Sequence, residues 1–344
     1  MATLTQDVRM PVVEDPETGK NTSPKFDAGR NFCNKLWNAA RFALSMLDRH
    51  PPTPGMPIAL EDLSLTDRWI ISRLSATTSA INTALATYQF KDYADALYDL
   101  LWRDFCDWYL EAIKPTLAED PNQPAVLRLV FDAILRLLHP VTPFITEAIH
   151  ERLATVPARE IDGLEFAGAA LAADTLARSG WPTPAPGTRD EVAEAAFDRC
   201  RELITVVREV RAKNGVPPKR RITLHASAAL ANDVQRWSPL VETLAGIDSV
   251  TTDAPEGLAS AFTFESGEHR LSNLADALDA GAERERLGDQ LARLDKDIAG
   301  LEGRLNNPGY TEKAPAHLVD QTRAQLEKAR ADRQTVADAL DKLA

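Results

Sequence analysis

An amide-rich stripe lies on an otherwise apolar helical pattern near the start of the chain. Apolar residues recur there at helical spacing, which predicts one buried helix face. They are Phe32, Leu36, Ala39, Ala43 and Leu47, and this apolar face is widened by Cys33, Trp37, Ala40 and Leu44. The polar residues of the same stretch are Arg30, Asn31, Asn34, Lys35, Asn38 and Arg41. Asparagine is a middling helix former, but its amide both donates and accepts hydrogen bonds, which suits the edge of a nucleic-acid base. An ordinary solvated helix face is the alternative interpretation.

A second cationic segment lies further along the chain. Residues 199–221 hold eight Lys and Arg against two Asp and Glu, although the chain of 344 residues has a formal charge of −12. Local patches matter more than net charge for binding nucleic acid, while most charge clusters are only solvated surface. The segment offers these candidate phosphate contacts: Arg208, Arg211, Lys213, Lys219, Arg220 and Arg221.

Spacing gives no catalytic or metal-binding site. Cys33, Cys106 and Cys200 lack the spacing of zinc ligands or redox pairs, so we expect reduced thiols packed within helices. His150 has no His or Cys companion at metal spacing, which favours a structural or surface role. The sequence also shows neither a signal-peptide pattern nor the roughly 18 apolar residues of a membrane span. We therefore expect a cytoplasmic protein without a membrane partner.

Helices must position the polar stripe. Proline breakers and capping residues predict a helix at about 29–49, one capped by Ser64 with Asp67 as reciprocal partner, one at 92–114, one at 124–138 and one opening at Pro143. Short connections predict antiparallel neighbours. The expected organisation is an extended segment at 1–28 followed by a helical bundle at 29–185.

The rest of the chain predicts two smaller parts. A helix at 190–213 and strand-like stretches at 221–225, 249–252 and 261–265 indicate a small α/β module over 190–280, with a possible hairpin turn at Ser266-Gly267. Residues 281–344 carry two heptad runs separated by Asn-Asn-Pro-Gly, which predicts an antiparallel coiled-coil hairpin. The predicted fold class is mainly α.

Several stretches resemble the valine–tRNA ligases, which are class I aminoacyl-tRNA synthetases. Residues 21–27, followed by Gly-Arg-Asn-Phe-Cys-Asn-Lys-Leu-Trp-Asn-Ala at 29–39, resemble the start of the anticodon-binding bundle. His139 to Glu147 resembles a segment shared by the Val, Leu, Ile and Met branch, where Ala148 and His150 replace the usual acid and tryptophan. Residues 301–315 resemble the tRNA-binding arm, which the valine enzymes have and the other three typically lack.

The resemblance implies tRNA recognition that supports ATP-dependent attachment of valine to its tRNA. The stripe on the first helix would contact the anticodon end, the basic segment would contact phosphates, and the partner would be a valine tRNA. The family's ATP-site signatures, His-x-Gly-His and Lys-Met-Ser-Lys-Ser, do not occur here. We therefore assign no catalytic residue and no cofactor to this chain, and ATP belongs to the family's catalytic domain.

Two further questions stay open at this level. The chain is expected to be a C-terminal fragment, a separately encoded half with a separate catalytic chain, or a truncated gene product, so its own enzymatic activity is undecided. A monomer is expected, because a hairpin that folds on itself has already buried its seam. The alternative is a standalone helical scaffold whose coiled coil binds protein.

Overall fold

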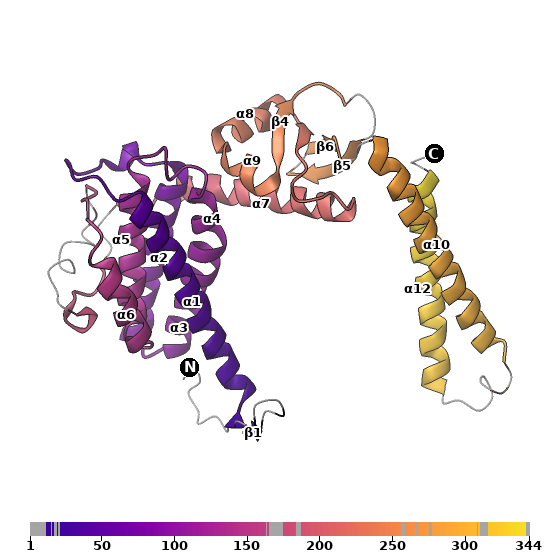
Figure 1. The fold of residues 1–344 in the computed structure, drawn as a ribbon, viewed down its shortest axis with the longest axis horizontal. Coiled ribbons are helices and arrows are strands. Elements are labelled where there is room, and N and C mark those ends of the chain that lie inside the picture. The colour runs from indigo at the N-terminus through magenta and orange to yellow at the C-terminus, as the bar shows by residue number, and fades with distance from the viewer. Residues whose placement is uncertain are drawn as a thin grey trace.

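The computed structural model describes residues 12–14, 16, 19, 21–162, 164, 175–183, 187–255, 259–265, 267–274, 277–307, 309 and 316–341. A helical bundle, a small α/β module and a helical hairpin follow one another along the chain (Figure 1). The bundle and the hairpin extend from opposite ends of the module in this view. The predicted mainly α fold class, with these three parts, is confirmed.

The bundle surrounds one fully buried helix. Its helices are α1 (Pro24–Arg49), α2 (Leu65–Ala86), α3 (Phe90–Tyr98), η2 (Asp99–Tyr109), α4 (Leu110–Ile113), α5 (Gln123–Leu138) and α6 (Pro143–Leu153), with a short turn η1 (Leu60–Asp62) before α2. Every residue of α5 is buried, so this helix forms the centre of the hydrophobic core. None of the helices in the described part of the chain is long and apolar enough to cross a membrane.

Local signals set most helix boundaries in the bundle. The Ser64 hydroxyl accepts a hydrogen bond from the Asp67 N–H across 3.2 Å, as the capping pattern predicted. The start of the first helix was predicted too late. α1 begins at Pro24 rather than at 29, because proline is tolerated in the first turn, where its missing N–H leaves no bond unmade. A strand pair, β1 (Val13–Glu14) with β2 (Asn21–Thr22), precedes it.

The predicted helix at 92–114 is continuous but unevenly wound. Its central section, η2, is π-helical, a form that helical periodicity alone does not reveal. The section still buries Phe105, whose ring stacks on Phe131 with centroids 5.4 Å apart. Trp108 is only partly buried and meets Phe197 edge-on. The predicted core role is therefore confirmed for Phe105, while Trp108 lies at the margin of the core.

The α/β module is a four-stranded mixed sheet with helices. It contains α7 (Glu191–Lys213), β3 (Ile222–His225), α8 (Ala228–Trp237), α9 (Leu240–Ala245), β4 (Ile247–Thr251), β5 (Ala259–Phe264) and β6 (Gly267–Ser272). The strand order is β4-β3-β6-β5, and only β3 and β4 run parallel. Pairing of Phe264 with Gly267 confirms a hairpin here, but Gly267 is already the first residue of β6, so the turn begins at Glu265, one residue earlier than predicted. A further short turn, η3 (Leu176–Arg178), precedes α7.

Helix α7 joins the module to the bundle. Trp69 of α2 and Phe197 of α7 stack with ring centroids 4.0 Å apart and an interplanar angle of 18°. At the start of α7, Asp190 caps the helix by accepting from the Ala193 N–H and also accepts from the Arg68 Nε across 2.8 Å. Because these rings are buried, α7 holds the two parts in one packed arrangement.

The C-terminal hairpin consists of α10 (Ala277–Leu305) and α12 (Ala316–Asp341). Several of the described seam residues are buried, among them Leu287, Val319, Leu326 and Val336. The predicted antiparallel hairpin with a break after Leu305 is confirmed. The last residue of the predicted seam, Leu343, lies outside the described residues.

Candidate nucleic-acid interface

The amide stripe lies on the solvent side of α1. Asn31, Asn34, Asn38 and Arg41 are all exposed, whereas Phe32 on the opposite face is buried. The three amides recur at spacings of three and four residues, which places them on one helix face. Their donors and acceptors are therefore presented together to a ligand.

Two predicted members of the stripe have protein partners. The Lys35 ammonium lies 2.6 Å from a carboxylate oxygen of Asp107 and 4.0 Å from the ring centroid of Trp102. The Arg30 guanidinium lies 2.8 Å from Asp27 on the preceding turn. Lys35 therefore ties α1 to η2, while the pair at Arg30 is solvent-exposed and of a kind that contributes little to stability.

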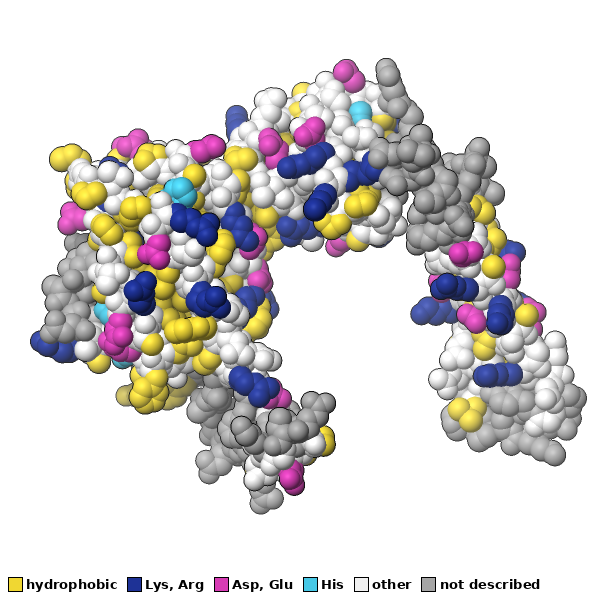
Figure 2. Space-filling view, viewed as in Figure 1, with side chains coloured by type: hydrophobic (Ala, Val, Ile, Leu, Met, Phe, Trp, Pro, Cys, Tyr) yellow, Lys and Arg dark blue, Asp and Glu magenta, His cyan; other side chains and the backbone are white. Residues whose placement is uncertain are grey.

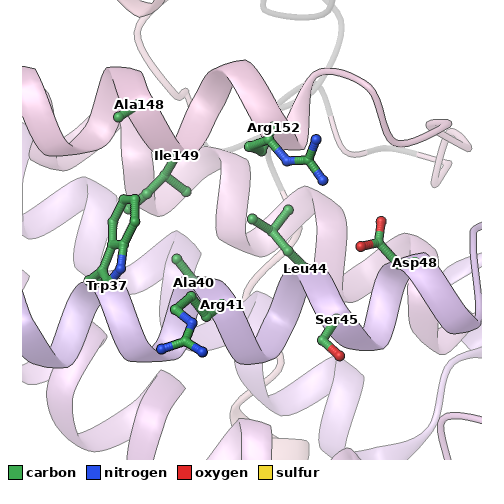
Figure 3. A pocket seen from close by; sticks show the side chains of 9 residues that line it. All are labelled: Trp37, Ala40, Arg41, Leu44, Ser45, Asp48, Ala148, Ile149 and Arg152. Carbon is green, nitrogen blue, oxygen red and sulfur yellow. The ribbon is translucent and has the colours of Figure 1, made fainter.

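A groove between α1 and α6 borders the stripe. It has a volume of about 290 Å³, and Figure 3 shows the side chains along it. Trp37 has 46% of its surface exposed and lies beside Ala148 and Ile149 of α6. Arg41 of α1 and Arg152 of α6 also line the groove, although the Arg41 guanidinium extends away from α6 in this view, and Asp48 lies near the end where Arg152 is.

This groove combines an indole ring with two guanidinium groups. Aromatic rings stack on unpaired bases, and arginines bind phosphate through several donors. Sequence reasoning had placed Trp37 on the apolar face and had not singled out Arg152 at all. The one signal was the departure at Ala148, because the small side chain there leaves space opposite Trp37.

The basic segment divides into buried and exposed residues. Arg211 is 7% exposed, and its guanidinium donates to three carbonyl oxygens, those of Ala245 at 2.9 Å, Pro217 at 2.7 Å and Pro218 at 3.1 Å. Burial lowers the pKa of Arg211. The structure thus corrects the predicted phosphate contact at Arg211, because this side chain faces the protein interior and holds backbone segments together.

The other five residues remain at the surface in differing degrees. Lys213 and Lys219 are exposed. Arg208 and Arg221 are also exposed, but each donates to a backbone carbonyl across 2.7 Å, those of Leu244 and Glu242 respectively. Arg220 is half-buried and also interacts with another group of the protein. Lys213 and Lys219 are therefore the side chains of this segment best placed to reach a phosphate.

Lys and Arg side chains are visible on the bundle, the module and the hairpin in Figure 2. Each patch also includes carboxylates or apolar side chains. Such a distribution suits a ligand that touches several separate points. A single strongly cationic cleft is not visible on this face.

The histidine and cysteine side chains considered as metal ligands or nucleophiles have surroundings that indicate structural roles. Among the residues that the structure describes, no group of three or more His, Cys, Asp and Glu could hold a metal ion. His150 is buried, with Nδ1 3.8 Å from an Asp132 carboxylate oxygen. The three cysteines are free, and burial raises the pKa of Cys106 and Cys200 to about 12, which keeps both thiols protonated at neutral pH.

Two family models match the chain. Residues 67–226 match the anticodon-binding domain of tRNA ligase, and residues 279–344 match the valyl tRNA synthetase tRNA binding arm. The first match covers α2 to β3 and ends within the α/β module. α1, which carries the amide stripe, lies before it.

Curated relatives match over almost the whole chain. A valine–tRNA ligase of Thermotoga maritima is 33% identical over 88% of this chain and 32% of the relative. The corresponding proteins of Sphingopyxis alaskensis and Clostridium acetobutylicum are 32% and 33% identical, over 90% and 88% of this chain and 35% and 34% of each relative. The chain thus spans about a third of the length of these relatives. It belongs to the valine–tRNA ligase family and corresponds to the C-terminal part of its members.

Proposed function

We propose that this chain recognises tRNA. The helical bundle would bind the anticodon loop, and the α/β module and the hairpin would position the rest of the tRNA. The observation that supports this most directly is the juxtaposition on α1. The exposed amides Asn34 and Asn38 lie on the helix that also presents Trp37 and Arg41 to the groove. Base edges, base faces and phosphates each have a complementary group within this one surface.

The proposed division of labour follows from how RNA is recognised. Phosphate contacts fix the position of a nucleic acid, and contacts to unstacked loop bases specify its sequence. Lys213 and Lys219 would contribute to positioning, while Asn34 and Asn38 would read bases. Because α7 packs on the bundle through Trp69 and Phe197, the positioning and reading surfaces keep a fixed separation.

The finer assignment concerns which tRNA is bound and in what setting. A valine tRNA as ligand is supported by the names of the relatives. Attachment of valine would use ATP on the catalytic portion of the family, either in a longer polypeptide or in a separate chain. A cytoplasmic location is in keeping with the free cysteines. A monomeric chain is in keeping with a hairpin that pairs its two helices with each other.

A binding titration tests the proposal. A valine tRNA transcript, the same transcript with altered anticodon bases and an unrelated tRNA are titrated against the chain at two salt concentrations. We expect the first to bind most tightly and all three to weaken as salt increases. Equal binding of all three would remove the anticodon-reading role. No binding of any, together with capture of a protein partner that requires the hairpin, would favour the scaffold alternative.

A further inference from the structure

The two lateral faces of the C-terminal hairpin differ in whether their cationic side chains form ion pairs within the hairpin. On one face, ion pairs cross between the helices. Arg330 of α12 lies 2.8 Å from Glu302 of α10, and Arg333 lies 2.6 Å from Asp295. Arg330 also lies 3.2 Å from Glu327 of its own helix. The cations of this face are therefore largely neutralised within the hairpin.

The opposite face is open. A groove of about 510 Å³ runs there between α10 and α12. Lys296 and Arg304 line it from α10, and Lys328 and Gln325 line it from α12. None of the three cations has an ion-pair partner within 4.0 Å among the residues that the structure describes. Their charges are available to a ligand, although Asp297 and Asp332 also line the groove.

A glycine lies between the two cations of α10. Gly300 lies inside the helix, toward its C-terminal end, where glycine is a much poorer helix former than alanine. A β-carbon at Gly300 would meet no heavy atom within 4 Å, so packing in the hairpin does not require the glycine. Its absence of a side chain instead leaves the helix backbone open to a ligand in the groove.

The spacing of the cations suits an extended polyanion. Lys296 and Arg304 are eight residues apart, which is about 12 Å along a helix. That length corresponds to several charges of a nucleic-acid strand, which carries one per roughly 3.4 Å of axis. Lys328 extends the positive charge to the second helix, and Gln325 supplies an amide that can donate to a phosphate or pair with a ribose hydroxyl.

We propose that this groove face, defined by Lys296, Gly300, Arg304, Gln325 and Lys328, is where the hairpin binds the sugar–phosphate backbone of tRNA. The proposal rests on the proposed function and adds the face and the residues that make the contact. RNA is favoured over an acidic protein because residues 279–344 match a tRNA-binding arm. The opposite face, closed by its own ion pairs, is turned away from the RNA.

Two double variants of the full chain separate a specific face from total charge. Arg304→Ala with Lys328→Ala removes two groove cations, and Arg323→Ala with Arg330→Ala removes two cations outside the groove. Affinity for a valine tRNA transcript is measured over a range of salt concentrations, and helix content is checked by circular dichroism. We expect the groove variant to bind roughly ten-fold more weakly, with a log–log salt slope smaller by about 0.7 to 0.9 per lost contact. The control variant should retain nearly all affinity.

A third variant tests the approach of the backbone without changing charge. Gly300→Leu places a strong helix former in the groove, so we expect a stable hairpin with weakened tRNA binding. Equal losses in both double variants, or full affinity in the groove variants, would overturn the proposed face while leaving tRNA binding itself intact. Self-association that disappears only in the groove variants would reassign the face to a contact between copies. A chain that does not bind tRNA at all would remove the proposed function, and this face with it.

Discussion

The Arg211 Nη1 atom donates to the carbonyl oxygen of Ala245 across 2.9 Å, and this bond joins the last turn of α7 to the end of α9. Gly246 follows with a φ of 71°. A β-carbon at Gly246 would lie 2.2 Å from the Arg211 Nη1 atom, so the close approach requires glycine. The same guanidinium reaches the carbonyls of Pro217 and Pro218. One buried cation therefore fixes three backbone segments of the module.

Replacing Arg211 should destabilise the module. Arg211→Met keeps the length of the side chain but leaves buried carbonyl oxygens without donors, which costs about 2 kcal/mol. We expect a lower urea midpoint by circular dichroism and faster amide exchange in β3 and β4. Lys213→Met is the matched control, because Lys213 is exposed on the same turn. An unchanged midpoint for Arg211→Met would contradict the structural role of Arg211 and favour the predicted phosphate contact instead.

Lys213 and Lys219 should show the opposite behaviour. Both are exposed, so Lys213→Ala with Lys219→Ala should leave the urea midpoint unchanged. Binding of tRNA should weaken, and the log–log salt slope should decrease by about 0.7 for each contact to single-stranded RNA. Arg236→Ala with Arg270→Ala removes two exposed charges elsewhere in the module as a control. A slope that stays the same in the lysine variant would identify these side chains as solvated surface.

Sequence reasoning succeeded where a local pattern decides the structure. The Ser64 cap, the helix starting near Pro124 and the break after Leu305 all depend on neighbouring residues. It failed where the partner is distant in sequence. The acceptor of Arg211 in α9, Ala245, is 34 residues away along the chain, and no periodicity reveals that the folded chain brings the two together.

The groove beside α1 shows a second limit. Helical periodicity placed Trp37 with the apolar residues, but its ring is nearly half exposed. Ala148 and Ile149 of α6 line the groove beside it. The packing of a separate helix, which periodicity within α1 does not reveal, thus bears on how deeply this ring is buried.

Asp67 should give stability a distinct pH dependence. Its carboxyl is fully buried and accepts hydrogen bonds from Ser64 and Tyr109, yet burial outweighs these bonds and raises its pKa from 3.8 to about 7. The folded state therefore holds a proton that the unfolded chain releases at lower pH. This contribution is present below about pH 4 and is lost as the pH rises toward 7, by at most about 1.4 kcal/mol per pH unit.

Asp67→Asn tests this dependence because asparagine does not titrate. Urea unfolding of both proteins at pH 5, 6, 7 and 8 gives the difference in unfolding free energy at each pH. We expect that difference to shift in favour of the variant from pH 5 to pH 7 and to level off above that. Cys106→Ser, at a half-buried thiol with a pKa of about 12, is the control. A difference that stays constant with pH would show that Asp67 is already ionised in the folded chain.

The amides of α1 should govern which tRNA is selected. Asn34→Ala with Asn38→Ala should reduce discrimination between a valine tRNA and the same tRNA with an altered anticodon. Each lost base hydrogen bond should cost on the order of 1 kcal/mol for the matching tRNA only. Asn306→Ala removes an exposed amide from the hairpin and should leave discrimination unchanged. Equal weakening for both tRNAs would assign Asn34 and Asn38 a structural role.

Removal of residues 282–344 should separate affinity from selectivity. α10 and α12 pack chiefly on each other, and their buried seam residues face the partner helix. The rest of the chain therefore loses little packing when the hairpin is removed. The hairpin's eleven basic and twelve acidic residues nearly balance, so its contribution should come from a few positioned contacts, without strong long-range attraction.

We therefore expect the truncated chain to keep its melting temperature and its preference for the valine anticodon, with a lower affinity for every tRNA. Both forms should sediment as monomers, because the hairpin pairs its seam within one chain. Sedimentation beside tRNA titrations of the two forms measures both quantities. A full-length dimer that becomes a monomer on truncation, with unchanged tRNA affinity, would show that the hairpin joins two copies and does not contact tRNA.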